Sequence, residues 1–96
     1  MATYVDDMRR RATVGRCSAR WSHLIADTTE ELLDFAKVLG LSPEWIQKPG
    51  THREHFDVTD GMRIRALAYG AVPITFQELT AVTRRIRAER RGAESA

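Results

Sequence analysis

Five carboxylate and imidazole side chains stand in or directly after short apolar runs, where a fold could bring them together. Asp6, Asp7 and Asp57 carry the carboxylates, and His23 and His55 carry the imidazoles. Carboxylates suit Mg²⁺ or Mn²⁺, and added imidazole moves the preference towards Mn²⁺, Zn²⁺ or Fe²⁺. We therefore predict that the three aspartates hold a divalent metal such as Mg²⁺, Mn²⁺ or Zn²⁺. The two histidines would then act as further ligands or as general bases.

Arginines form two clusters that could neutralise a phosphate-bearing ligand, one within residues 9–20 and the other within residues 84–91. If the carboxylates and imidazoles form a site, Arg16 and Arg20 would hold the substrate phosphates of a metal-assisted phosphoesterase or nuclease-like enzyme. The same clusters support a second hypothesis, a non-catalytic module that binds nucleic acid or a partner protein. A solvated basic surface is a further reading, because the net charge is only +2.

Structural roles for the polar residues compete with this chemistry. Asp27 and Asp57 come before predicted helices, whose N-terminal ends favour negative charge. Asp6 and Asp7 could pair with nearby arginines, and a histidine in a strand is often a hydrogen-bonded core residue. The same groups could also hold a small ligand without any reaction.

Several sharper motifs are absent from the sequence. Cys17 is the only cysteine, so neither an intramolecular disulfide nor a cysteine-based zinc cluster can form. His52 and His55 are three residues apart, unlike the His-Glu-x-x-His pair of metalloproteases. No glycine-rich phosphate loop precedes a predicted helix. Trp21 and Trp45 could stack on bases beside the arginines, but we expect them to cap a small core.

Three helices are expected to support these groups. Capping boxes that begin at Thr28 and Thr75, each with glutamate three residues later, mark the starts of two of them. The first is predicted over residues 29–39, and the other begins after Thr75 and is rich in arginine at its end. Thr59 caps the remaining helix, predicted over residues 60–69.

Four short apolar runs predict strands, at residues 3–6, 22–26, 55–58 and 71–74. Their alternation with helices in the second half favours parallel strands joined by crossovers. We thus expect a small two- or three-layer α/β fold, with about four short, mainly parallel strands and three helices. The carboxyl ends of such strands share an edge, where open α/β sheets bind ligands. Residues 8–20 show no helical period and are predicted to form a basic loop.

The length of 96 residues suits one domain, predicted over residues 1–91, with a frayed tail at 92–96. Apolar residues make up 43% of the chain and charged residues 29%, which argues against disorder. No apolar run is long enough to cross a bilayer, and arginines stand where a signal peptide needs an apolar stretch. We expect a cytoplasmic protein that does not bind a membrane.

Short motifs spread along the chain form a distinctive set. They are Tyr4-Val5-Asp6-Asp7-Met8, Gly15-Arg16, Trp21-Ser22-His23-Leu24-Ile25-Ala26-Asp27-Thr28, Glu31-Leu32, Trp45 with Gln47, His55-Phe56-Asp57-Val58-Thr59, Gly70-Ala71-Val72 and Thr75. Together, from about residue 3 to residue 86, they resemble a family of actinobacteria and bacteriophages catalogued as domain of unknown function 4031. The resemblance implies a compact intracellular protein but no particular activity.

The resemblance also implies that a set of polar residues belongs to one site: Asp6, Asp7, His23, Asp27, His55 and Asp57. The chain departs from the family pattern at two positions. Phe56 stands where tyrosine is expected, and Met62 stands where lysine is usual before Arg63. If that lysine contacts a ligand, Arg63 or another residue must serve in its place here.

Overall fold

The computed structural model describes residues 2–95, and this part of the chain forms five strands, three α-helices and one short 3₁₀ turn. In chain order they are β1 (Thr3–Val5), β2 (Arg10–Val14), β3 (Cys17–Ala26), α1 (Thr29–Leu39), η1 (Pro43–Trp45), β4 (Phe56–Thr59), α2 (Asp60–Ala68), β5 (Val72–Pro73) and α3 (Phe76–Ser95). The three predicted helices are confirmed. The Thr28, Thr59 and Thr75 hydroxyls each accept a backbone N–H from the first turn of the helix that follows.

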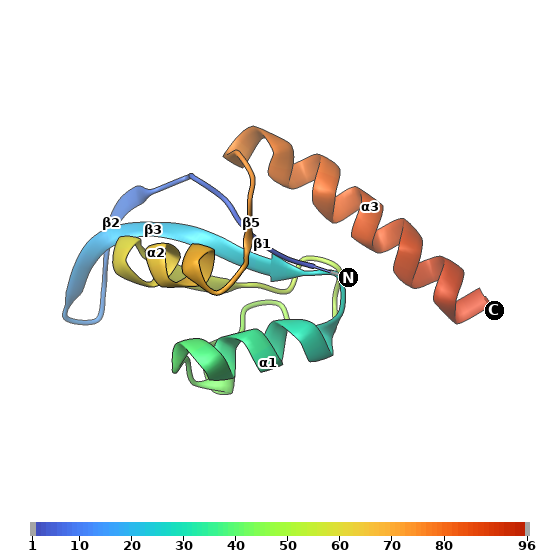
Figure 1. Cartoon of the computed structure of the whole chain (residues 1–96), viewed down its shortest axis with the longest axis horizontal. Helices are drawn as coiled ribbons and strands as arrows, with labels where there is room; N and C mark the ends of the chain where they lie inside the picture. Colours follow the sequence, from blue (N-terminus) through green and yellow to red (C-terminus); the bar gives the residue numbers. More distant parts are fainter. Residues whose placement is uncertain (1, 96) are drawn as a thin grey trace.

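The sheet is built around the long strand β3 and is mostly antiparallel (Figure 1). β3 pairs antiparallel with β1, β2 and β4, whereas β1 pairs parallel with the edge strand β5. Leu24 pairs with both Val5 and Phe56, so β1 and β4 lie on opposite sides of β3. The prediction of about four mainly parallel strands is therefore wrong, because β3 runs against the strands on both sides of it.

A second correction concerns residues 8–20, which were predicted to form a loop. They contain β2 and the first part of β3, which make a hairpin joined by Gly15 and Arg16. Gly15 has φ +62°, as the first residue of a two-residue hairpin turn of type II′ requires. Every residue of β2 is exposed, so no apolar alternation marks this strand in the sequence.

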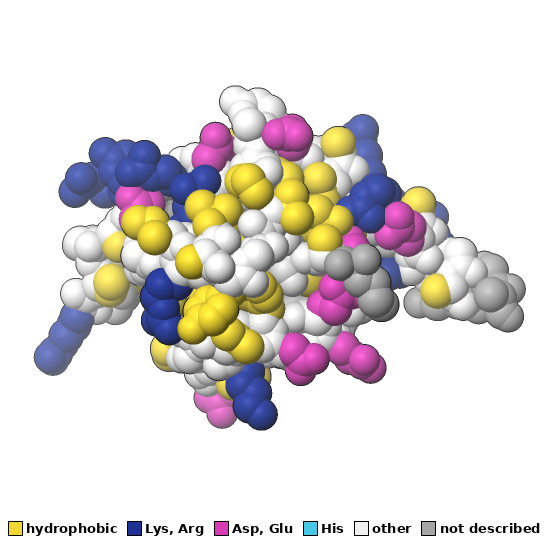
Figure 2. All heavy atoms as spheres, in the orientation of Figure 1, with side chains coloured by type: hydrophobic (Ala, Val, Ile, Leu, Met, Phe, Trp, Pro, Cys, Tyr) yellow, Lys and Arg dark blue, Asp and Glu magenta, His cyan; other side chains and the backbone are white. Residues whose placement is uncertain are grey.

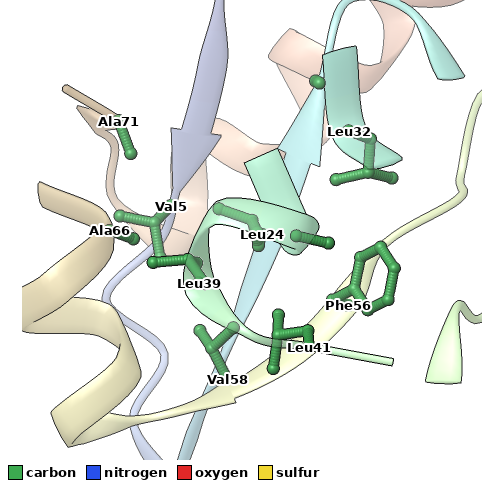
Figure 3. Close-up of a cluster of buried hydrophobic side chains, with 11 residues drawn as sticks. Val5, Leu24, Leu32, Leu39, Leu41, Phe56, Val58, Ala66 and Ala71 are labelled. Atoms are coloured by element: carbon green, nitrogen blue, oxygen red, sulfur yellow. The ribbon is translucent and has the colours of Figure 1, made fainter. Parts of the chain in front are cut away.

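The main hydrophobic core lies between the sheet and the helices α1 and α2 (Figure 3). Leu24, Phe56 and Val58 point from the sheet towards Leu32 and Leu39 of α1, and all five side chains are at most 1% exposed. Alternation along β3 sends His23 and Ile25 to the opposite face. The protein therefore has three layers, with α3 on that second face of the sheet (Figure 1).

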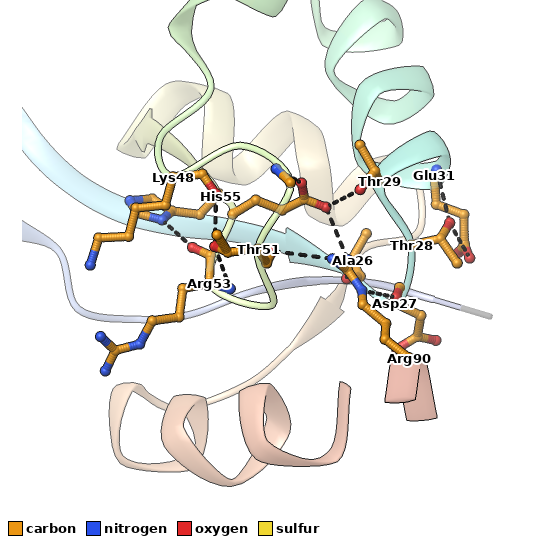
Figure 4. A network of polar contacts seen from close by, with 12 residues as sticks. Ala26, Asp27, Thr28, Thr29, Glu31, Lys48, Thr51, Arg53, His55 and Arg90 are labelled. Carbon is orange, nitrogen blue, oxygen red and sulfur yellow. Dashed lines mark hydrogen bonds and ion pairs between the residues drawn. The ribbon is translucent and has the colours of Figure 1, made fainter. Parts of the chain in front are cut away.

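α3 is held to the sheet by a small apolar cluster and by a polar network. Ile86 packs against Ile25 and Ile74. Arg90 reaches the buried Glu54 carboxylate at 2.9 Å and also donates to the carbonyl of Asp27, at the end of β3 (Figure 4). The segment from Gly92, predicted to be a frayed tail, is helical as far as Ser95, and Ala96 lies outside the described residues.

None of the helices between residues 2 and 95 combines the length and the apolar character that crossing a membrane requires.

Candidate metal centre

His23 is fixed in the middle of the sheet by the buried carboxylate of Asp6. Asp6 directly follows β1 and is fully buried. Its Oδ2 lies 2.7 Å from His23 Nδ1, and its Oδ1 accepts the backbone N–H of His23 at 2.8 Å. An ionised carboxylate is an acceptor, so Nδ1 carries the proton and Nε2 is the ring nitrogen available to a ligand.

The pKa values of this pair reflect their close contact. The hydrogen bond to Asp6 raises the pKa of His23 above its ordinary value, although burial of the ring opposes this. Burial opposes ionisation of the Asp6 carboxyl, but the side-chain and backbone hydrogen bonds from His23 outweigh it and hold the pKa of Asp6 below its usual value. Asp6 is therefore a carboxylate at neutral pH.

His55 is oriented in the same way by a backbone carbonyl. Its Nδ1 lies 2.9 Å from the carbonyl oxygen of Arg53, which can only accept a hydrogen bond. The proton therefore sits on Nδ1, and Nε2 faces Asp57 Oδ1 at 3.5 Å. The His23 and His55 rings meet edge to face, with their centroids 5.1 Å apart.

His23, His55 and Asp57 each place a possible ligand atom within 4.8 Å of the other two. Around a tetrahedral metal with bonds of about 2.1 Å, ligand atoms lie about 3.4 Å apart. The 3.5 Å between His55 Nε2 and Asp57 Oδ1 already matches this spacing. The Asp57 side chain is 43% exposed, so it is free to rotate and adjust the distances from its oxygens to the two imidazoles.

A pocket of about 160 Å³ opens beside the two histidines, between the sheet and α3. Lys48 and Arg53 stand on the sheet side, and Thr80 and Thr83 of α3 stand on the other. The pocket therefore offers two cations and two hydroxyls beside the available imidazole nitrogens, a set that suits a small oxyanion such as a phosphoryl group.

The other residues predicted for the site lie elsewhere. Asp7 accepts the backbone N–H of Phe76 at 2.7 Å, at the first residue of α3. Asp27 directly follows β3 and pairs with Ala2, so it lies at the opposite end of β1 from Asp6. Arg16 lies in the exposed hairpin turn. Arg20 pairs with Arg11, and alternation along β3 puts it on the face opposite His23.

Five residues that support the site were missed from the sequence: Thr80 and Thr83 of α3, and Lys48, Arg53 and Glu54 of the loop before β4. Lys48 and Arg53 line the pocket, and Glu54 anchors their loop through hydrogen bonds from Gly50 and Thr29. No spacing rule identifies them, because a bridge between Gln47 and His55 brings the loop to the sheet. Arg63, which with other residues was considered as a replacement for the family's lysine if that lysine contacts a ligand, donates from its Nε to the backbone oxygen of Asp6 at 2.8 Å.

Comparison with known proteins identifies the family of the chain but no relative of known function. No curated protein and no solved structure matches it. The family model described as protein of unknown function (DUF4031) matches residues 3–87, which is most of the 96-residue chain. The match confirms the family suggested by the sequence motifs. The chain therefore belongs to the DUF4031 family.

Proposed function

We propose that the protein binds a divalent metal through His23 Nε2, His55 Nε2 and an oxygen of Asp57, and uses it to hydrolyse phosphate esters. The observation that carries the proposal is the matched orientation of the two imidazoles. Each has its Nδ1 fixed by an acceptor, Asp6 or the carbonyl of Arg53, which leaves Nε2 for a ligand. Histidines that bind metals typically make this second hydrogen bond to a carboxylate or a backbone carbonyl.

The ligand set indicates the metal and the kind of site. Two imidazoles and one carboxylate favour Zn²⁺, Mn²⁺ or Fe²⁺ over Mg²⁺, which prefers oxygen ligands alone. Three protein ligands leave a coordination position for water or substrate, as in catalytic zinc sites. A metal in this position would lower the pKa of a bound water and polarise a phosphoryl oxygen.

The pocket residues support a phosphate ester as substrate. Lys48 and Arg53 would hold the non-reacting phosphoryl oxygens, and Thr80 and Thr83 can donate hydrogen bonds from α3. In the hydrolysis, the water oxygen forms a bond to phosphorus and the bond from phosphorus to the ester oxygen breaks. One water proton goes to solvent, and the leaving oxygen takes a proton from solvent.

Metal titration with thermal unfolding tests the metal site. At one hundred times Kd, a bound metal adds about 2.7 kcal/mol to the free energy of unfolding, or at least about 10 °C in Tm for a domain of this size. We expect Zn²⁺ or Mn²⁺ to produce such a shift, a chelator to reverse it, and Asp57→Asn or His55→Gln to abolish it. His52→Gln is the matched control, because His52 lies outside the candidate ligand set.

Hydrolysis of bis(p-nitrophenyl) phosphate then tests the chemistry. We expect activity in the metal-loaded protein, and loss of that activity in Asp57→Asn but not in His52→Gln. A protein whose Tm responds to no divalent metal would contradict the whole proposal. Metal binding without hydrolysis of any phosphate ester would contradict the enzymatic part and leave a metal-binding protein.

A further inference from the structure

A second and larger hollow, here called the tryptophan groove, lies beside β4 next to the candidate metal ligands. It encloses about 440 Å³ and is lined by Val14, Trp21, Leu41, Glu44, Trp45, Gln47, Asp57, Thr59 and Met62. Trp45 is 60% exposed, an unusual position for a side chain of this size. Asp57 belongs both to this groove and to the candidate metal ligands.

The register of the sheet shows how the groove and the metal ligands are connected. His23 pairs with Asp57 and Trp21 pairs with Thr59, so these four side chains share one face of the sheet. Gln47 pairs with His55 and extends this face beyond β4. Trp21 lies two residues before His23 on β3. A ligand with one group at Asp57 and His23 can therefore place its next group against Trp21.

The hairpin that continues from Trp21 is strongly basic. Arg10 pairs with Trp21 and so shares the face of the groove, and Arg16 is exposed in the hairpin turn, whereas the exposed Arg11 and Arg20 lie on the other face of the hairpin. No acidic residue occurs between Asp7 and Asp27. Figure 2 shows Lys and Arg side chains projecting from the end of the molecule where the hairpin lies in Figure 1. The groove thus leads from the metal ligands to a surface that attracts a polyanion.

We propose that the tryptophan groove binds a base of a single-stranded nucleic acid, and that the adjacent phosphodiester lies at the metal centre. This inference rests on the proposed phosphoesterase function and names its substrate class. Trp21 and Trp45 offer ring faces on which a base can stack, and Arg10 beside Trp21, with Arg16 in the turn, would contact the phosphates that follow. A duplex does not fit this arrangement, because its bases are already stacked and paired inside the helix.

Fluorescence anisotropy with a labelled eight-nucleotide oligothymidylate tests the inference, in the presence of a chelator so that the strand is not cleaved. We expect Trp45→Leu to weaken binding about tenfold, as the loss of one stacked base implies. Tyr69→Leu is the matched control, since Tyr69 is a comparably exposed aromatic residue on the C-terminal side of α2, outside the groove. Arg10→Gln should weaken binding and reduce its dependence on salt.

The outcomes separate this inference from the proposed function. If metal binding and ester hydrolysis hold but the oligonucleotide binds Trp45→Leu as tightly as wild type, the groove does not hold a base. Equal affinity for duplex and single strand would also overturn the inference. If a polyglutamate peptide displaces the labelled oligonucleotide as well as the unlabelled oligonucleotide does, the surface would be assigned to an acidic protein instead. The reverse result is also informative. If the protein binds no metal but binds the oligonucleotide in a way that requires Trp45, the phosphoesterase proposal is overturned and the base-binding site is retained.

Discussion

Arg90 connects α3 to the loop that carries much of the candidate site, and its replacement gives the most informative stability test. Its guanidinium donates to Glu54 Oε2 at 2.9 Å and to the backbone oxygens of Asp27 and Thr51, each at 3.1 Å. Glu54 is only 2% exposed and also accepts hydrogen bonds from Thr29 and Gly50. Arg90→Ala would therefore leave a buried carboxylate without its cation.

The expected cost follows from the burial of this ion pair. Removing one partner of a buried ion pair typically costs 3–5 kcal/mol, roughly, because the remaining charge stays buried and uncompensated. The Arg90 side chain is 23% exposed, so water can partly replace it, and we expect about 3 kcal/mol, at the lower end of that range. For a domain of this size that corresponds to a fall in Tm of at least about 12 °C.

Urea unfolding followed by tryptophan fluorescence measures this loss directly. Arg84→Ala is the matched control, because Arg84 is exposed on the same helix, and it should change the free energy of unfolding by less than about 0.5 kcal/mol. Glu54→Gln removes the charge of the buried side chain. The loss in the free energy of unfolding caused by Arg90→Ala should therefore be about 2 kcal/mol smaller in the Glu54→Gln background than in wild type. A loss below about 1 kcal/mol in Arg90→Ala would refute the reasoning.

Two further predictions concern Asp6 and Asp27. Asp6→Asn should weaken metal binding about 10- to 100-fold by calorimetry, because Asp6 orients His23. Asp34→Asn, at an exposed carboxylate on α1, should leave the affinity unchanged. Burial opposes ionisation of Asp27, but hydrogen bonds from Arg85, the Ala2 N–H and Tyr4 outweigh it and lower the pKa of this carboxyl. Its charged form thus stabilises the fold above the ordinary aspartate pKa of about 3.9, and Asp27→Asn should cost about 2 kcal/mol at neutral pH. That difference should shrink as pH falls through the lowered pKa, and a pH-independent difference in chemical unfolding would contradict this account.

Local signals in the sequence determined the helices and the presence of most strands. Thr28, Thr59 and Thr75 each have a side-chain oxygen that satisfies a free N–H group one turn later, an interaction set by neighbours in the chain. The family also followed from short motifs. The types and positions of His23 and His55 were enough to mark them as chemically capable residues.

Tertiary structure alone decided strand direction and the division of roles among the polar residues. Strand direction depends on pairing between distant segments, so the run at residues 22–26 looked the same in a parallel or an antiparallel sheet. Because β3 runs antiparallel to its neighbours, Asp27 lies far from Asp6 along the sheet, and Asp57 comes opposite His23. The loop that brings Lys48 beside the histidines is positioned by long-range contacts, which leave no periodic trace in the sequence.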